Sequence, residues 1–462
     1  MRLYFDALTE IGPFAHKHPA ERWSLGHLQE EMVHCAIASA MVFSAQSRLY
    51  DPALGNLRLS HELANHPRLH AIWNVMPDVT DEFPSPDRLI QQMREYEVRA
   101  ASISPQTNGW DLFDPASRPL FDRLQEERIP LYLSRKELPD FPTLRQLLEQ
   151  WPDLPVILTG AIWSEQRFLL PILQRSRNLY ITFDHYQVHY GLEDLVEKGL
   201  EDQLLFGSNA PKMSMGAHRC FVDYAEISES AKEKIAWRNL AKLLRFDTIP
   251  CPGEVPNDDA IMQAARLGIP LPCPVVDMHM HILDEGLNGG GGSYRMKNGD
   301  PKGVLHLLNR LGCHSGGFMS WNGTVCADSR QGNACTRAAL DQLPETFWGL
   351  GSFDPTHYTP EQLASEIPKL YEDPRFIGMK PYHVHRVPYD SPLYAPWWEF
   401  GNKRGMYALI HRVKPDFSEV LALAERYPRV HWVVAHCGGS YAVADMAIEA
   451  TRQFPNIYAE IT

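Results

Sequence analysis

The sequence lacks the features that mark several common classes of protein. No apolar run approaches the roughly 20 residues that a membrane-spanning helix needs, and no signal-peptide core follows the acidic N-terminus. Its eight cysteines form no C-x-x-C pair and therefore predict free thiols. Lys and Arg number 44 against 57 Asp and Glu. This negative balance argues against nucleic-acid and membrane partners, which need clustered basic residues. We therefore expect a cytoplasmic protein.

What the sequence does contain is an internal repeat. Residues 144–161 and 420–437 both read as an amphipathic helix, an aromatic-proline pair and a short apolar run. We interpret this as a duplication. Residues 1–245 would be the first copy, 246–274 a proline-rich connector, and 275–462 the second copy. Within the connector, the sequence predicts one short helix. It would run from Asp258 to Leu267, with Asn257 as its N-cap.

Each copy alternates short apolar runs with helical patterns, which predicts an α/β fold with a parallel sheet. Eight such runs in the first copy predict a TIM-type (β/α)₈ barrel. They lie near residues 3–6, 36–43, 71–75, 100–103, 130–133, 155–159, 179–183 and 204–207. The alternative is an open doubly wound sheet. Its dinucleotide-binding version is disfavoured because no G-x-G-x-x-G follows a strand.

The duplication predicts two tandem barrels of this type, and the second should lack its last strand. Thr462 aligns with Asp184, whereas the first copy continues to about Leu244. A parallel barrel cannot close without its eighth strand, because two edges stay unpaired. We therefore expect either a natural chain that continues past Thr462 or a partner that completes the sheet, and we favour the first.

Histidines follow three apolar runs of the second copy. His279 and His281 alternate along one run and should face the same side. His411 and His436 each directly follow a further run. The carboxyl ends of barrel strands meet at one rim, where catalytic residues of this fold lie. Since zinc enzymes use three protein ligands and leave one position open, the pattern predicts a shared metal site.

The first copy serves as an internal comparison for these histidines. The aligned positions there hold Leu8, Glu10, Ser134 and Gly160. All four imidazoles are absent together while the apolar strands remain. Ligands of one metal would change as a set, whereas unrelated core histidines would not. We therefore interpret the first copy as a degenerate barrel without metal ligands.

On these motifs, both halves resemble the amidohydrolase superfamily, in its branch of amidohydrolase-related metal-dependent hydrolases and decarboxylases. In the second copy, the matching segments are Asp277-Met278-His279-Met280-His281, Gly378-Met379-Lys380, Ile410-His411, Ala435-His436-Cys437-Gly438-Gly439 and Tyr458-Ala459-Glu460. In the first copy, Phe206-Gly207-Ser208-Asn209-Ala210-Pro211 resembles the final strand motif. The resemblance covers nearly the whole chain except the connector.

The resemblance implies a role for each histidine. His279, His281 and His411 would bind one divalent metal ion, with zinc as the first choice and manganese as the alternative. His436 would position or polarise the attacking water or the substrate. The family's last catalytic residue is an aspartate on strand eight. The first copy has Asn209 there, and the second copy ends before it.

Three further residues are candidates for contact with a substrate. Lys380 ends an apolar run and could bind a substrate carboxylate; in binuclear relatives, a lysine on this strand bridges two metals. His383 forms a second H-x-H with His385, beyond Pro381, and Glu460 follows the last apolar run. The glycines at 289–292 lack the Gly-Lys-Ser/Thr of a phosphate loop. They predict either a plain surface loop or the hinge of a lid.

The leading hypothesis is a metal-dependent hydrolase in which activated water attacks a small carboxylated or cyclic substrate. A non-oxidative decarboxylase with the same metal site is the first alternative. A non-catalytic binding or scaffolding protein is the second. The expected partners are a small-molecule substrate and a second copy of the chain in a homodimer, with the degenerate barrel as the docking surface.

Overall fold

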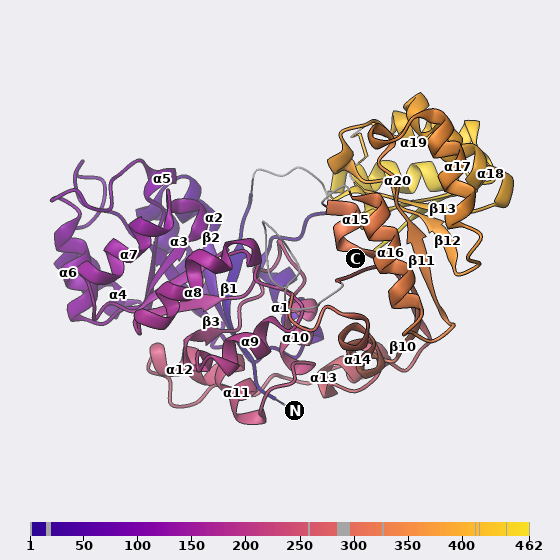
Figure 1. Ribbon diagram of the computed structural model, residues 1–462. Coiled ribbons are helices and arrows are strands. Elements are labelled where there is room, and N and C mark those ends of the chain that lie inside the picture. The colour runs from indigo at the N-terminus through magenta and orange to yellow at the C-terminus, as the bar shows by residue number, and fades with distance from the viewer. Residues whose placement is uncertain are drawn as a thin grey trace. The chain divides into compact units, whose positions relative to one another are not determined.

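A computed structural model gives the protein as two compact units, Met1–Ile269 and Pro270–Thr462 (Figure 1). The residues it describes are 2–14, 20–256, 259–283, 296–325, 328–411, 413–414, 416–439 and 441–461. The glycines at 289–292 and the predicted N-cap Asn257 lie outside these ranges. None of the helices within them is both long and apolar enough to cross a membrane.

The first unit contains a parallel sheet of eight strands in sequence order. Each of the eight predicted apolar runs overlaps one of these strands, which confirms the predicted α/β barrel for this unit. The strands are β1 (Phe5–Ile11), β2 (Ser39–Ser44), β3 (Leu69–Asn74), β4 (Ala100–Ile103), β5 (Leu131–Ser134), β6 (Val156–Thr159), β7 (Leu179–Thr182) and β8 (Leu204–Leu205).

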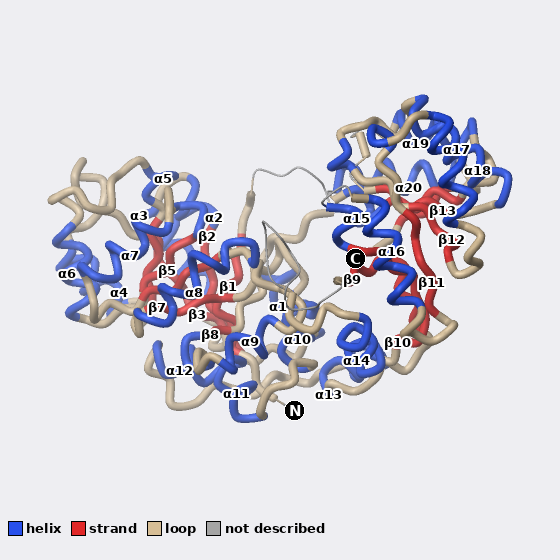
Figure 2. Tube along the Cα trace, in the orientation of Figure 1, coloured by secondary structure: helices blue, strands red, loops and turns tan. Residues whose placement is uncertain are grey.

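Helices separate these strands along the chain and flank them in space (Figure 2). They are α1 (Leu25–His34), α2 (Ala45–Leu49), α3 (Pro52–Leu63), α4 (Pro86–Glu95), α5 (Pro105–Asn108), α6 (Arg118–Glu126), α7 (Phe141–Gln150), α8 (Gln166–Arg175), α9 (Gly191–Glu197), α10 (Met215–Asp223), α11 (Glu229–Glu233), α12 (Asn239–Leu243) and α13 (Ala260–Leu267).

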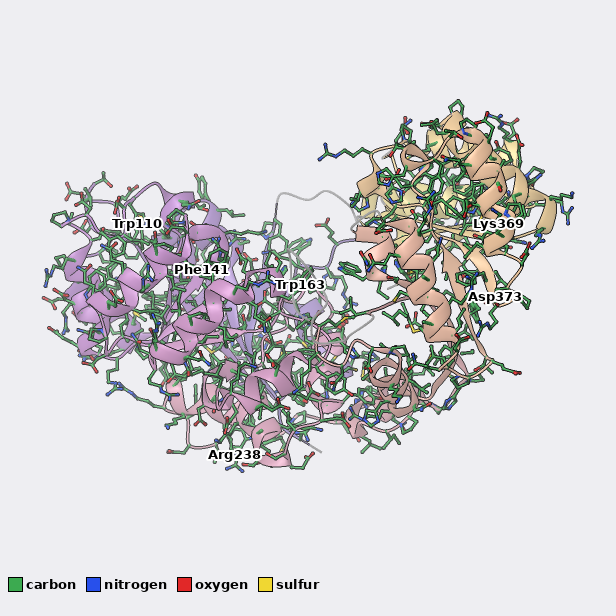
Figure 3. The ribbon with its side chains drawn as sticks, viewed as in Figure 1. Trp110, Phe141, Trp163, Arg238, Lys369 and Asp373 are labelled. Atoms are coloured by element: carbon green, nitrogen blue, oxygen red, sulfur yellow. The ribbon has the colours of Figure 1, made fainter. Side chains whose placement is uncertain are left out.

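Helix α7 illustrates why these segments are helical. The Asp140 side chain caps it by accepting the backbone N–H of Thr143. Its apolar residues recur at helical spacing and bury one face against the strands. Phe141, labelled in Figure 3, lies at the start of the helix. Its ring stacks on that of Phe168 with ring centres 5.5 Å apart. Leu144 and Leu147 of this helix are fully buried, and burial of such a side chain contributes about 1.5–3 kcal/mol to stability.

Helix α13 begins later than the sequence pattern suggests. Its N-cap is Asp259, whose side chain accepts the N–H of Met262. The helix contacts α10 and belongs to the first unit, which extends to Ile269.

The eight-stranded sheet of the first unit closes on itself. The N–H of Ala7 donates to the carbonyl of Phe206 at 2.8 Å, and the N–H of Asn209 donates to the carbonyl of Leu8 at 2.8 Å. Thr9 and Ala210 form a further parallel bridge. The segment after β8 therefore supplies the pairing that a barrel needs between its last and first strands.

The second unit contains seven parallel strands, again in sequence order from β9 to β15. They are β9 (Val275–Ile282), β10 (Cys313–Ser320), β11 (Phe347–Gly351), β12 (Phe376–Met379), β13 (Tyr407–Ile410), β14 (His431–Val434) and β15 (Ile457–Ala459). Its helices are α14 (Pro301–Leu311), α15 (Trp321–Val325), α16 (Ser329–Leu340), α17 (Pro360–Leu370), α18 (Ala395–Arg404), α19 (Ser418–Arg426) and α20 (Tyr441–Gln453).

Strands β15 and β9 are the two ends of this seven-stranded sheet. The prediction of a second barrel without its last strand is thus confirmed. A cavity of about 730 Å³ lies beside these strands, with walls that include Val276, Leu311 and Tyr458. Trp397 and Trp398 of α18 are fully buried in the core of this unit, and their rings stack with centres 5.3 Å apart. They are packing residues of the core.

Candidate metal centre

The four predicted histidines lie at the carboxyl ends of three strands in the second unit. His279 and His281 lie near the end of β9, and His411 directly follows β13. His436 lies in a 3₁₀ turn, Ala435–Gly438, that directly follows β14. Asp277 orients the first of them, because its carboxylate accepts the backbone N–H of His279 at 3.0 Å.

The structure brings these four side chains together. The ring centre of His279 lies 5.0 Å from that of His436, 5.5 Å from that of His281 and 6.5 Å from that of His411. His411 and His436 are also 5.0 Å apart. In a tetrahedral zinc site, the ring centres of two ligating imidazoles lie roughly 5 Å apart. Most of the observed separations therefore suit a shared ion, and the pair His279–His411 is wider.

Glu460 joins this group from the end of β15. One of its carboxylate oxygens lies 3.6 Å from Nδ1 of His279 and accepts the backbone N–H of His436 at 2.8 Å. Donor atoms of His279, His436 and Glu460 all lie within 4.8 Å of one another. Sequence reasoning expected a substrate contact from Glu460, whereas the structure also gives it the position of a metal ligand.

The donor set can be tested for its fit to a metal ion. Nδ1 of His281 is buried and has no hydrogen-bond partner among the described residues. A buried polar atom without a partner is costly, and a bound cation would satisfy it. Imidazole and carboxylate groups are typical zinc ligands. The residues present therefore fit a divalent ion.

Electrostatics also favours neutral imidazoles at this rim. Burial, and then the positive charge of Lys380, lowers the pKa of His281 well below its ordinary value. The same two causes lower the pKa of His411 to about 3. Burial also lowers the pKa of His279 and of His436. Metal ions bind the neutral form of histidine, so these rings remain in a binding-competent form at neutral pH.

Lys380 lies beside His279 in this group. It directly follows β12, is fully buried, and its ammonium nitrogen lies 3.1 Å from Nε2 of His279. Burial lowers the pKa of Lys380 to about 7, while the Glu460 carboxylate acts in the opposite direction. With a pKa of about 7, Lys380 carries its charge in only part of the molecules at neutral pH, and a bound anionic group would favour the protonated form.

The second H-x-H motif separates into two environments. Nδ1 of His383 lies 3.1 Å from Nδ1 of His411, and their rings stack with centres 4.9 Å apart. His385 contacts the hydroxyl of Tyr394 at 3.2 Å instead. His383 therefore belongs to the site. The two histidines do not form a second pair of ligands.

Aromatic side chains complete the surroundings. Trp321 packs edge-on against His281 with ring centres 4.8 Å apart, and Tyr382 lies 5.3 Å from His411. Sequence reasoning missed Tyr382, whose only signal is its place beside His383.

The backbone is strained at one point of the site. His436 and Cys437 have φ angles of 55° and 45°, in the left-handed region that non-glycine residues rarely adopt. Such residues cost of order 1–3 kcal/mol each and cluster at functional sites. The strained turn directs the chain from β14 toward the glycines that follow.

Fold and geometry together define the class: an all-parallel α/β barrel protein whose second unit gathers imidazoles at the carboxyl ends of its strands. The chain belongs to the amidohydrolase family, because the family model described as Amidohydrolase matches residues 56–246 and 276–462.

Several solved structures are similar to the chain over about half its length. A TIM-barrel protein from Bordetella bronchiseptica is 18% identical with a TM-score of 0.43, covering 53% of this chain and 98% of its own. The 5-carboxyvanillate decarboxylase from Sphingomonas paucimobilis is 15% identical with a TM-score of 0.43, covering 53% and 100%. The 2,6-dihydroxybenzoate decarboxylase from Rhizobium is 14% identical with a TM-score of 0.42, covering 54% and 100%. No curated protein sequence matches the chain.

Proposed function

We propose that the second unit binds one divalent metal ion and acts as a hydrolase on a small carboxylated or cyclic substrate. The observation that carries this proposal is the convergence of four histidines from three strands on one rim. The ring centre of His279 lies 5.0–6.5 Å from those of His281, His411 and His436, and His411 lies 5.0 Å from His436. Membership of the amidohydrolase family supports it.

His279, His281 and His411 are the proposed ligands, with zinc as the first choice and manganese as the alternative. Glu460 is a further candidate ligand because it shares the group of His279 and His436. When bound, such an ion supplies a Lewis acid and makes hydroxide available near neutral pH.

The chain's own residues would bind and orient the substrate. The buried ammonium of Lys380 pairs with a substrate carboxylate, which in turn offsets the cost of burying a cation. His383 lies beside His411 at 3.1 Å and can donate a hydrogen bond to the same substrate. Trp321 packs against His281 and limits the access of water from that side.

His436 and Glu460 are the proposed residues for polarising the reacting group and for proton transfer. Their contact at 2.8 Å joins the backbone N–H of His436 to the Glu460 carboxylate, which leaves the imidazole ring itself facing His279 and His411. In this proposal, His436 polarises the reacting group and the Glu460 carboxylate accepts the proton. Glu460 is therefore the proposed proton acceptor among the described residues.

A decarboxylase with the same site is the second candidate, and the buried Lys380 beside His279 favours it. An ammonium in that position would hold the carboxylate of an acid next to the ligands. Product analysis separates the two reactions, because only a decarboxylase releases carbon dioxide from the substrate.

The test is the metal content of the purified full chain. We expect about one zinc or manganese ion per chain, lost in His279→Ala and kept in the control His314→Ala, which removes an exposed histidine from the start of β10. A well-folded wild-type protein that holds no metal after exposure to zinc and manganese would refute the enzymatic proposal. It would favour a binding or scaffolding protein.

A further inference from the structure

The first unit contains a cavity of about 240 Å³ that the proposed function does not use. Its walls include Glu10 of β1, Ser134 at the end of β5, Gly160 after β6 and Asn209 after β8. The cavity therefore opens at the carboxyl ends of the strands, where TIM barrels bind their ligands. The whole of its lining belongs to the first unit.

The carboxylate of Glu10 in this cavity is neutralised by basic side chains of the same unit. Glu10, which aligns with His281 of the second unit, is 5% exposed. Its carboxylate accepts hydrogen bonds from Arg48 at 2.6 and 3.1 Å and is paired with the ammonium of Lys212. Guanidinium and ammonium groups thus surround this carboxylate, so the arrangement does not resemble a set of ligands for a metal cation.

The other two carboxylates of the lining are engaged by local donors. Glu137 accepts two backbone N–H groups and one hydroxyl at the start of α5. Asp184 accepts the hydroxyl of Thr182, the N–H of Gly160 and a contact from His185. Lys136, by contrast, is exposed at the cavity and forms no ion pair with any described residue. Positive charge at the wall is therefore available to a ligand.

A buried hydroxyl gives a second, independent sign of a ligand. Tyr132 lines the cavity and is 1% exposed, and its hydroxyl has no hydrogen-bond partner in the described part of the chain. Buried hydroxyls in proteins are almost always paired. The same wall carries apolar groups from Leu8, Phe43 and Ile103. A suitable occupant would accept a hydrogen bond and offer an apolar surface.

We propose that the first unit binds a small carboxylic acid with a flat apolar body in this cavity, without a metal ion. The carboxylate pairs with Lys136, the Tyr132 hydroxyl donates to an oxygen of the ligand, and Phe43 packs against its body. The volume lies below the roughly 300–1,000 Å³ of pockets for drug-sized ligands, which limits the acid to a single ring. This barrel is thus a second ligand site, separate from the metal centre.

The full chain is titrated with benzoate or with 4-hydroxybenzoate in the presence of a chelator, and isothermal titration calorimetry measures the binding. The His279→Ala variant is titrated in parallel. We expect saturable binding of one acid at millimolar concentration in both proteins. Binding that disappears in His279→Ala would assign the acid to the second unit and overturn the proposal, and so would the absence of binding of either acid.

Two variants locate the site within the first unit. Lys136→Ala should weaken binding about tenfold, the effect expected for one charged hydrogen bond. The matched control Lys242→Ala, an exposed lysine of α12 outside the cavity, should leave it unchanged. Tyr132→Phe removes only the hydroxyl, and we expect a smaller loss of affinity. Unchanged affinity in both Lys136→Ala and Tyr132→Phe would overturn the proposal.

Discussion

Asp6→Asn should make the stability of the first unit less sensitive to pH. Asp6 belongs to β1, is fully buried, and contacts Ser208 in the segment after β8. One carboxylate oxygen accepts the N–H groups of Leu8 at 3.0 Å and Ser208 at 2.9 Å. The other is buried without a partner among the described residues. Asparagine keeps an acceptor for the two N–H groups and removes the charge.

The magnitude follows from the pKa of Asp6, which burial raises from 3.8 to about 6 against the opposing effect of its hydrogen bonds. A raised pKa in the folded state contributes stability that is fully present below pH 3.8. That contribution is lost as the pH rises through about 6. The shift of about 2.2 pH units corresponds to about 3 kcal/mol. About 2 kcal/mol of this should be lost between about pH 4.5 and about pH 7.

Hydrogen exchange of peptides that cover β1 is the appropriate assay, because two units need not unfold together and a single free energy of unfolding is then undefined. The opening free energy of Asp6→Asn relative to the wild type should rise by about 2 kcal/mol over that pH range. A relative opening free energy that stays constant with pH, or falls, would contradict the reasoning.

Asp140→Asn provides a control of opposite sign. Hydrogen bonds from Thr143 hold the pKa of the exposed Asp140 below its ordinary value. Its contribution to stability is therefore lost as the pH falls, so raising the pH should slightly disfavour this variant relative to the wild type.

Three further outcomes are expected. Gly55→Ala should destabilise the first unit by about 1–3 kcal/mol, because its Cβ would lie 2.5 Å from the backbone nitrogen of Ser47; an unchanged thermal midpoint would contradict this. Glu460→Gln should lower the affinity for zinc about tenfold or more in competition with a chelator, whereas an unchanged affinity would remove Glu460 from the metal centre. Lys380→Met should keep the metal content and raise KM for a carboxylated substrate more than it lowers kcat. If the substitution raised KM equally for a substrate without a carboxylate, Lys380 would not pair with the substrate carboxylate.

The fold was largely predictable because buried parallel strands leave a strong local pattern. Each apolar run of the first copy overlaps a strand, because strands that are buried on both faces are read as short, nearly continuous apolar runs. The alternation of His279 and His281 along β9 follows from the same period of two. Boundaries were less predictable: α13 begins after Asp259 because the capping side chain, and not the apolar pattern, determines where a helix starts.

The composition of the site was only partly predictable. The sequence indicated which strands carry imidazoles, because each follows an apolar run. It did not reveal that Glu460 would lie 3.6 Å from His279, or that His383 would stack on His411 while His385 would not. Loop residues after a strand carry no periodicity from which their direction can be deduced.

The sequence by itself determined the parallel strands, their order and the residues that end them, because burial periodicity and strand-end chemistry are local properties of the chain. The tertiary structure alone decided which charges meet. Lys380 contacts His279 across 101 positions of sequence, and Lys212 reaches Glu10 across 202. Such contacts depend on how the parallel strands bring their carboxyl ends to one rim and on the paths of the loops that follow them, and both arise only when the unit packs.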